Sequence, residues 1–234
     1  MVLKRFYPLP NSTERYPKEV VWDFSTPPGV GAIYFETGAF SSGALAVTVG
    51  VKTIAEFSLI EIDRRFRMIQ TFDVNYRLDR VTFVREHRQG TTAPERPHLA
   101  ISDLVGTWKG TATTFYANSE SPIVTTTEST FTTRDLGYRL VEDDRRIDLT
   151  VAIDDRAERL LQFCDDEEGQ SYQILLLPDG GYATTPTQIR LGHAFYLEIG
   201  WMYQTGKRQR LVRRYDSTGK WASATFITEE ITRS

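Results

Sequence analysis

The chain has little of what most metal and redox chemistry needs. Its 234 residues contain one cysteine and three histidines. Cys164 alone cannot form an intrachain disulfide or a zinc site built from several cysteines. His87, His98 and His193 are not grouped at ligand spacing, so we expect no metal and no cofactor. The sequence also has no phosphate-binding glycine loop and no Gly-x-Ser-x-Gly nucleophile motif. A nearly cysteine-free chain suits a reducing compartment, and we expect a cytoplasmic location.

Long hydrophobic runs are also missing. The longest one, residues 44–51, is interrupted by Thr48 and Gly50 and is far too short to span a bilayer as a helix. Residues 1–10 contain no apolar stretch of the kind found in a signal peptide. The net charge of −3 and the pI near 5.7 give no general attraction to nucleic acid. We therefore expect a protein that neither spans a membrane nor binds nucleic acid.

Strand signals dominate what is present. Val, Ile, Thr, Phe and Tyr recur in short runs broken by turn residues, and long helical periodicity is nearly absent. In the first part we expect strands at 19–24, 32–37, 44–49, 56–61, 66–72 and 80–85. In the second part we expect them at 106–116, 125–132, 138–142, 146–153, 158–165, 171–177, 181–186, 194–203, 209–215 and 221–229. Many short strands at regular spacing indicate an all-β barrel or sandwich.

Two stretches of the chain repeat one pattern. The matched residues lie 143 positions apart: Arg65 and Arg208, Arg67 and Arg210, Glu86 and Glu229, Gly38 and Gly181. Apolar and charged positions both match, which indicates one supersecondary unit used twice. The segment that opens the second copy, 106–108, has no counterpart, so the first copy is partial. Gly90, Pro94 and Pro97 interrupt pairing between the copies. We expect a partial β unit at 1–90, a linker at 91–97 and a complete barrel at 98–234.

The start of the second copy resembles a known fold. Residues 101–105 predict one helical turn, capped by Ser102 or Asp103. Gly106-Thr107-Trp108 then begins a strand. This resembles the Gly-x-Trp opening of lipocalins and their calycin relatives, in which a short helix closes the barrel floor and the Trp packs beneath it. The resemblance implies an all-β fold: a lipocalin-like (calycin) antiparallel β-barrel preceded by a partial copy of the same barrel. Such a barrel can hold one small ligand.

A second resemblance concerns the chemistry. Four residues match in spacing the Glu-x-x-Trp-Phe and Asn-x-Arg-x-Arg patterns of the S-type phycobilin lyases: Glu198, Trp201, Arg208 and Arg210. Those lipocalin-like barrels attach bilins to light-harvesting proteins. Met202 and Gly206 depart from the pattern, standing where that family has an aromatic residue and an Asn. The resemblance implies a bilin or similar chromophore, and a protein acceptor, as partners.

The whole chain resembles more closely a cyanobacterial and plastid family of two-barrel, lipocalin-like proteins without an assigned activity. The motifs that carry this resemblance are residues 38–41, 92–97 and 210–215, together with Trp221. It supports the expected fold and leaves the activity open.

The candidate site follows from strand geometry. Arg208 and Arg210 are two apart on a strand and face the same side, where they can hold the carboxylates of an amphipathic anion. Trp201 and Tyr203 complete the expected ligand-binding set. Glu198, Tyr196 and His193 are the acid–base candidates if the site is catalytic. The competing interpretation is structural, because an arginine near a lipocalin floor commonly stacks on the Trp.

Three functions stay open at this point. The first is a carrier or chaperone for a hydrophobic or conjugated molecule with carboxylates, such as a bilin, another tetrapyrrole or an isoprenoid. The second is an enzyme of the same fold, a bilin lyase or a cyclase or isomerase acting on a polyene. The third is a protein-binding scaffold with a filled barrel, and the size of the lumen discriminates it from the others. We also expect a homodimer, because an unclosed first copy exposes an apolar face and strand edges.

Overall fold

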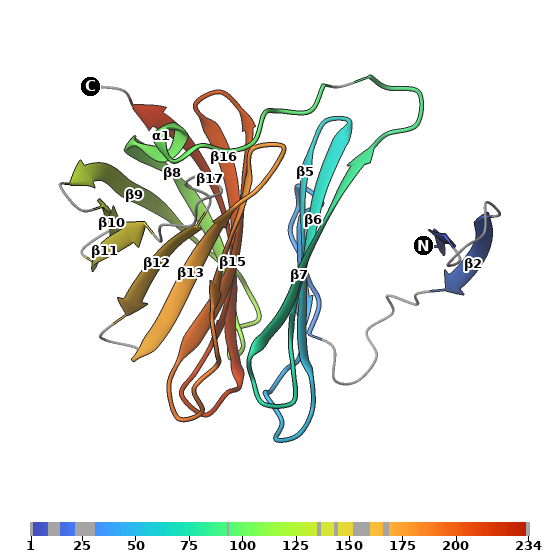
Figure 1. Ribbon diagram of the computed structural model, residues 1–234, viewed down its shortest axis with the longest axis horizontal. Helices are drawn as coiled ribbons and strands as arrows, with labels where there is room; N and C mark the ends of the chain where they lie inside the picture. Colours follow the sequence, from blue (N-terminus) through green and yellow to red (C-terminus); the bar gives the residue numbers. More distant parts are fainter. Residues whose placement is uncertain are drawn as a thin grey trace.

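A closed antiparallel barrel and a separate five-stranded sheet make up most of the molecule (Figure 1). The computed structural model describes residues 2–8, 15–21, 31–92, 94–134, 137–142, 145–151, 160–165 and 169–232. β1 (Val2–Pro8) and β2 (Arg15–Val21) pair with each other. The sheet contains β3 (Ile33–Tyr34), β4 (Phe40–Gly43), β5 (Thr53–Glu61), β6 (Arg64–Phe72) and β7 (Leu78–His87).

The barrel is built from ten strands. They are β8 (Gly106–Tyr116), β9 (Ile123–Arg134), β10 (Gly137–Glu142), β11 (Arg145–Val151), β12 (Leu160–Asp165), β13 (Gln170–Leu176), β14 (Gly181–Pro186), β15 (Phe195–Gln204), β16 (Lys207–Tyr215) and β17 (Trp221–Thr232). Each strand pairs with the next, and β17 closes the ring by pairing with β8 from Ser223 opposite Tyr116 to Thr232 opposite Thr107. Closure leaves none of these strands as a free edge. The lipocalin-like fold expected from the sequence is confirmed.

The predicted helical turn and buried Trp form the barrel floor, but the N-cap residue is Ala100 and not Ser102 or Asp103, as we expected. The short helix α1 (Ile101–Leu104) precedes β8, and the Asp103 carboxylate accepts a hydrogen bond from the Ala100 N–H at 2.9 Å. Trp108 is fully buried, and its Nε1 donates to the Leu104 carbonyl at 2.9 Å. The indole therefore ties the helix to the first barrel strand.

The five-stranded sheet packs one face against the outside of the barrel wall. Side chains on alternate positions of β5 and β6 point into this contact and are fully buried: Phe57, Leu59, Phe66, Met68 and Phe72. The Phe66 ring stacks on Trp201 of β15 at a centroid distance of 5.8 Å. It also lies over Gly181, where any Cβ would collide with it. Sheet and barrel therefore share one hydrophobic core.

The strand expected at 44–49 is wrong. The segment follows β4 as a loop that crosses the turn between β16 and β17, with one isolated bridge from Ala46 to Lys220. Its path is set by Arg213, which is fully buried and donates to the carbonyls of Gly43 at 3.2 Å and Ala44 at 3.3 Å. The Gly43 carbonyl also accepts from the Gly31 N–H at 3.1 Å, and the Ala44 N–H still donates to the Ile54 carbonyl of β5 at 3.4 Å. Regular pairing with β5 therefore ends at Ala44.

Other predicted strands differ mainly in their ends. The strand expected at 32–37 is reduced to β3, whereas those expected at 56–61 and 80–85 are longer, as β5 and β7. The strand expected at 19–24 lies earlier, as β2. Residues 22–24 and 152–159, the ends of three predicted strands, lie outside the described residues.

The internal repeat is visible in the strand register. Arg65 pairs with Glu86 between β6 and β7, as Arg208 pairs with Glu229 between β16 and β17. Both hairpins have an irregularity at the same place, between Thr71 and Phe72 and between Arg214 and Tyr215. The two hairpins therefore match residue for residue at a spacing of 143.

The spacing changes upstream of these hairpins. The register of β15 shifts between Trp201 and Gln204, because β15 contains one extra residue there. The corresponding stretch of β5 has no such insertion. The pair Ser42–Glu56 consequently matches Thr184–Glu198, at a spacing of 142. Gly38, with φ 87°, corresponds to Gly180, with φ 69°, so the match we expected with Gly181 is wrong by one residue. With this correction, β3–β7 repeats β13–β17 strand for strand.

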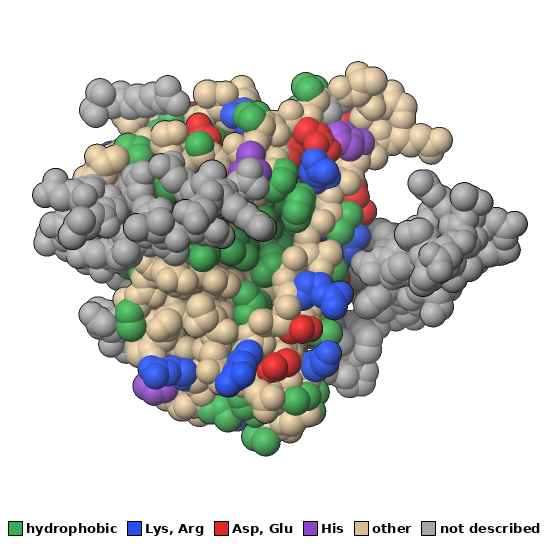
Figure 2. All heavy atoms as spheres, in the orientation of Figure 1, with side chains coloured by type: hydrophobic (Ala, Val, Ile, Leu, Met, Phe, Trp, Pro, Cys, Tyr) green, Lys and Arg blue, Asp and Glu red, His purple; other side chains and the backbone are tan. Residues whose placement is uncertain are grey.

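The apolar face that led us to expect a homodimer is largely covered by the chain's own barrel. Phe57 and Leu59 are fully buried, and Phe35 packs against Phe115 and Phe226 of the barrel at ring distances of 5.5 Å. Acidic and basic side chains intersperse on the surface seen in Figure 2, without one large patch of a single sign. Self-association stays a prediction, and burial of this face removes its main physical reason.

We expect Trp108→Ala to lower the free energy of unfolding by about 3–5 kcal/mol, because it removes a large buried ring and the bond to α1. Urea denaturation of both proteins measures this. Tyr116→Ala is the matched control, since Tyr116 lies on the same strand but is 42% exposed, and its effect should stay within about 0.5 kcal/mol. Equal effects of the two substitutions would contradict the role of Trp108 in the floor.

Candidate binding site in the barrel lumen

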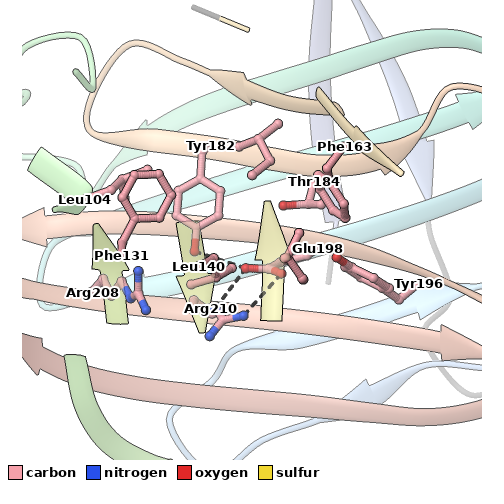
Figure 3. A pocket seen from close by; sticks show the side chains of 12 residues that line it. Leu104, Phe131, Leu140, Phe163, Tyr182, Thr184, Tyr196, Glu198, Arg208 and Arg210 are labelled. Carbon is pink, nitrogen blue, oxygen red and sulfur yellow. Dashed lines mark hydrogen bonds and ion pairs between the residues drawn. The ribbon is translucent and has the colours of Figure 1, made fainter. Parts of the chain in front are cut away.

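Three neighbouring strands place polar side chains inside the barrel. Side chains alternate along a strand, so every second residue of β14, β15 and β16 points inward. The polar groups lining the pocket are Tyr182, Thr184, Tyr196, Glu198, Arg208 and Arg210. Apolar side chains line the rest: Leu104, Phe131, Leu140, Ile147, Phe163 and Ile174. Figure 3 shows these residues converging on one small space.

An ion-pair network occupies the polar side of this pocket. Arg210 donates from Nε to Glu198 Oε1 at 2.8 Å and from Nη2 to Oε2 at 3.3 Å (Figure 3). Its Nη1 also lies 3.6 Å from Glu229 Oε1. Each of these side chains is at most 6% exposed. Arg210 is therefore held between two carboxylates, from β15 and β17.

Arg208 extends the network toward the floor. Its Nε donates to Glu229 Oε2 at 2.6 Å and its Nη2 to Ser129 Oγ at 2.7 Å. The guanidinium lies 4.3 Å from the centre of the Trp108 ring, a cation–π contact. Two arginines and two glutamates thus balance one another's charge in a buried site, where an unpaired charge would cost several kcal/mol.

Tyr182 completes the polar cluster. Its hydroxyl donates to Glu198 Oε1 at 3.0 Å. Burial raises the pKa of Tyr182 far above its ordinary value, and the neighbouring Glu198 carboxylate raises it further. The phenol therefore stays protonated and remains a donor to Glu198. Gly200 makes room for the ring, since a Cβ there would collide with it.

The space left between these side chains is small. The cavity volume is about 40 Å³. A water molecule needs roughly 10–15 Å³ by the same measure, whereas pockets for drug-sized ligands hold about 300–1,000 Å³. The pocket accommodates a few water molecules and not a bilin.

The structure brings four of the seven predicted site residues into the lumen: Tyr196, Glu198, Arg208 and Arg210. It places Trp201 on the opposite side of the wall, where its Nε1 donates to the Asp179 carbonyl at 2.9 Å. Tyr203 lies on an outer groove with Glu61 and Pro94. His193 is exposed in the loop before β15, and its N–H donates to the Arg190 carbonyl. Trp201, Tyr203 and His193 therefore do not belong to the lumen cluster.

Three residues of the cluster escaped the sequence reasoning: Tyr182, Glu229 and Ser129. Glu229 could have been found, because the repeat pairs it with Glu86. Nothing in the sequence around Tyr182 and Ser129 marks them as site residues. They lie at the site only because β14 pairs with β15 and β9 pairs with β8. In the part of the chain that the structure describes, no three His, Cys, Asp or Glu residues gather as a metal would require. No helix of the described chain is long and apolar enough to cross a membrane.

Two family models match the chain. Residues 95–232 match the model described as Biogenesis factor required for ATP synthase 1, C-terminal domain. Residues 1–91 match the N-terminal model of the domain of unknown function DUF3598. No curated protein matches the chain.

Two solved structures are similar to parts or all of the chain. A protein of unknown function from the DUF3598 family of Nostoc punctiforme is 34% identical, with a TM-score of 0.80 over 95% of this chain and 80% of that one. An S-type phycobiliprotein lyase from Guillardia theta is 12% identical, with a TM-score of 0.36 over 57% of this chain and 91% of that one. The fold and floor define a lipocalin-like barrel protein. The chain belongs to the DUF3598 family.

Arg210→Ala should lower the free energy of unfolding by about 3–5 kcal/mol, because it leaves Glu198 and Glu229 buried without their shared partner. Chemical denaturation at neutral pH measures the loss. Lys109→Ala is the control: Lys109 pairs with Glu128 at 3.0 Å, but both side chains are more than half exposed, and about 0–1 kcal/mol is expected. A loss below about 1 kcal/mol for Arg210→Ala would show that the lumen network does not stabilise the fold.

The raised pKa of Tyr182 predicts a pH dependence. The unfolded chain ionises this tyrosine near pH 10, whereas the folded protein keeps it neutral. The contribution of neutral Tyr182 to the free energy of unfolding is therefore fully present below about pH 10 and is lost as the pH rises further. Tyr182→Phe removes this pH dependence. The amount by which the variant's free energy of unfolding falls below that of the parent should therefore shrink between about pH 9 and 11. Tyr116→Phe, an exposed control, should leave unchanged the slope of the free energy of unfolding against pH. Parallel plots of this free energy for the parent and Tyr182→Phe would contradict the prediction.

Proposed function

We propose that this chain is a protein-binding factor that acts in the assembly of ATP synthase, with its barrel serving as a rigid scaffold. The match of residues 95–232 to the C-terminal model of a biogenesis factor required for ATP synthase supports the process. The lumen supports the scaffold role, and this observation carries the proposal. Arg208 and Arg210, the two groups expected to hold a ligand, are already paired with Glu229 and Glu198.

The energetics of the lumen favour a scaffold over a carrier. A carboxylated ligand would have to displace Glu198 or Glu229 from an arginine and leave that carboxylate buried without a partner, at a cost of several kcal/mol. It would also need several times the 40 Å³ that the lumen side chains leave. A filled, ion-paired barrel instead holds its outer surface in one shape, which reduces the entropy lost when a partner protein binds.

Binding of a chromophore in the lumen is the second candidate. One observation favours it: four residues chosen from the sequence for such binding converge in one pocket, together with Tyr182. In this alternative the chain carries a bilin, another tetrapyrrole or an isoprenoid, or acts on it as a lyase or a cyclase or isomerase. Glu198 is then the proton acceptor and Tyr182 the neighbouring donor. The apolar side chains from β10 to β13 must then move outward to admit the ligand.

Binding to purified ATP synthase subunits tests the scaffold function. With the full chain immobilised, we expect at least one subunit to bind at micromolar concentration or tighter, as measured by biolayer interferometry. Thr184→Leu, which fills the lumen cavity without changing charge, should leave this binding unchanged because the lumen takes no part in it. An absence of binding to every subunit, with the parent protein folded, would overturn the proposal.

Fluorescence titration with biliverdin tests the second candidate. Here Thr184→Leu should abolish binding, and Arg210→Ala should weaken it by about 1.5–3 kcal/mol, the range for a hydrogen bond to a charged group. Saturable binding that both substitutions weaken would favour the carrier over the scaffold. No saturable binding, or binding unchanged in both variants, would remove the lumen from consideration as a ligand site.

A further inference from the structure

At one end of the contact between the sheet and the barrel, the two copies exchange the same backbone hydrogen bonds. The loop 44–52, before β5, bonds the turn 216–220 and the start of β17. The loop 187–194, before β15, bonds the turn 73–77 and the start of β7 in the same way. We call these four connections the junction loops. The equivalent pairs of N–H and carbonyl groups are Val47 with Gly219 and Ile189 with Tyr76, both at 2.9 Å, Trp221 with Leu45 at 2.8 Å, and Leu78 with Thr187 at 3.1 Å.

These contacts define an approximate two-fold axis between the copies. Each copy gives its loop to the other copy's turn, which is the reciprocal contact that a two-fold axis produces. The four junction loops lie together at the lower end of the molecule in Figure 1, so the axis runs along the strands toward this end. Equivalent points on the two copies therefore lie at equal height along the axis, and one flat surface across it contacts both.

The two longer junction loops carry equivalent apolar tips. Each contains a four-residue turn, 48–51 or 190–193, in which the fourth N–H donates to the first carbonyl, at 3.1 and 3.3 Å. The third residue of each turn is a glycine, with φ of 75° and 86°. The second residue, at the tip, is Val49 in one loop and Leu191 in the other, and these side chains are 78% and 49% exposed. Two exposed aliphatic side chains therefore occupy equivalent positions.

Exposed hydrophobic side chains gather at this end of the molecule. Of the eleven large hydrophobic side chains that are exposed in the described chain, five belong to the junction loops, and all five are aliphatic: Leu45, Val49, Val51, Val74 and Leu191. Figure 2 shows hydrophobic side chains at the lower end of the molecule, next to basic ones. A concentration of exposed apolar surface of this kind marks an interaction site.

The tips point beyond the ends of the strands. A further strand added beside β3 or β7 would extend the sheet sideways, at a spacing of about 5 Å, and would leave the tips uncovered. No described atom lies within 4 Å of a Cβ built on Gly50 or Gly192, the residues that follow the two tips. The exposure of Val49 and Leu191 therefore does not depend on what pairs with the edges of the sheet.

The charges of the junction loops suit an anionic surface. They contain two carboxylates and four exposed basic side chains, a net charge of +2 (4 − 2) in a chain whose total is −3. Both carboxylates accept hydrogen bonds from N–H groups of their own turns, at 2.8 and 3.0 Å in each case. The carboxylates are Asp73 and Asp216, and the basic residues are Lys52, Arg77, Arg190 and Lys220.

We propose that the junction loops dock this protein on the surface of an anionic lipid membrane, with Val49 and Leu191 inserted at the boundary between headgroups and acyl chains. Aliphatic side chains enter this boundary, and lysine and arginine near it are attracted to anionic lipids. A membrane is flat, so two tips at equal height meet it together. Binding hot spots for proteins are instead rich in Trp, Tyr and Arg, whereas the exposed hydrophobic side chains here are aliphatic. The inference does not use the proposed function.

Vesicle flotation tests the docking. We expect the full chain to bind vesicles of phosphatidylcholine with about one third phosphatidylglycerol at least tenfold more tightly than vesicles of phosphatidylcholine alone. Val49→Asp and Leu191→Asp should each weaken this binding about fivefold or more, because each removes an aliphatic anchor and adds a repelled charge. Both residues are exposed, so both variants should keep the parent's Tm.

Two matched controls separate the junction loops from the rest of the surface. Ile62→Asp makes the same kind of change at an 86% exposed residue. Ile62 follows β5 at its other end, about 30 Å from the junction loops and beyond the reach of screened charge, so binding should stay within about twofold. Lys220→Ala should weaken binding about fivefold, whereas Lys109→Ala, at an exposed lysine near the far end of β8, should stay within about twofold.

Several outcomes would overturn the proposal. Equal binding by the parent and Leu191→Asp is one. Absence of flotation is another, and it is the result expected if the acidic runs at 142–144 and 165–168 outweigh the basic side chains. A loss of binding to an ATP synthase subunit in Leu191→Asp, without flotation of the parent, would assign the junction loops to a partner protein. A dimer that Leu191→Asp dissociates would assign them to a second copy of this chain. Flotation uses no ATP synthase subunit, so its failure is distinguishable from failure of the proposed function.

Discussion

Neutralisation of two buried arginines is the constraint on which the rest of the structure depends. Arg208 and Arg210 lie in a lumen where an unpaired charge would cost several kcal/mol, so Glu198 and Glu229 must stay within bonding distance. This requirement couples β15, β16 and β17 in one register, and Arg208 couples them further to Trp108 and the floor helix. The same pairing fills the polar side of the lumen, and our proposal of a scaffold role rests on this.

Much of the fold could be predicted from short stretches of sequence. Alternating apolar and polar residues define strands, and turn residues define the hairpins between them. The two Arg-rich hairpins, the Trp108 floor and most barrel strands follow from these signals. The loop at residues 44–49 did not, since Arg213 reaches it from a strand about 170 residues away in sequence. The match of Gly38 was wrong by one residue, because a single irregularity in β15 changes the spacing and leaves no mark in composition.

The candidate site was half predictable for a geometric reason. Arg208 and Arg210 are two residues apart and share a face, as do Tyr196 and Glu198. Glu198 and Trp201 are three apart, so on one strand they point to opposite sides, and spacing alone could have separated them. Trp201 packs on Phe66 of the sheet instead, where it joins the two halves of the core. A family pattern in sequence therefore mixed lumen residues with residues of the outer wall.

The pairing of β8 with β17 also orders events during synthesis. The strand that closes the ring, Trp221–Thr232, is synthesised last of the ten barrel strands, whereas its partner, Gly106–Tyr116, emerges more than a hundred residues earlier. Until then the barrel is an open sheet, and its contacts of high sequence separation form late. The sheet β3–β7 is complete well before that moment, yet the wall that covers its apolar face is not. A nascent chain therefore exposes Phe57, Leu59 and Phe66 until the barrel strands that cover them have been synthesised, and this interval is when it most needs a chaperone.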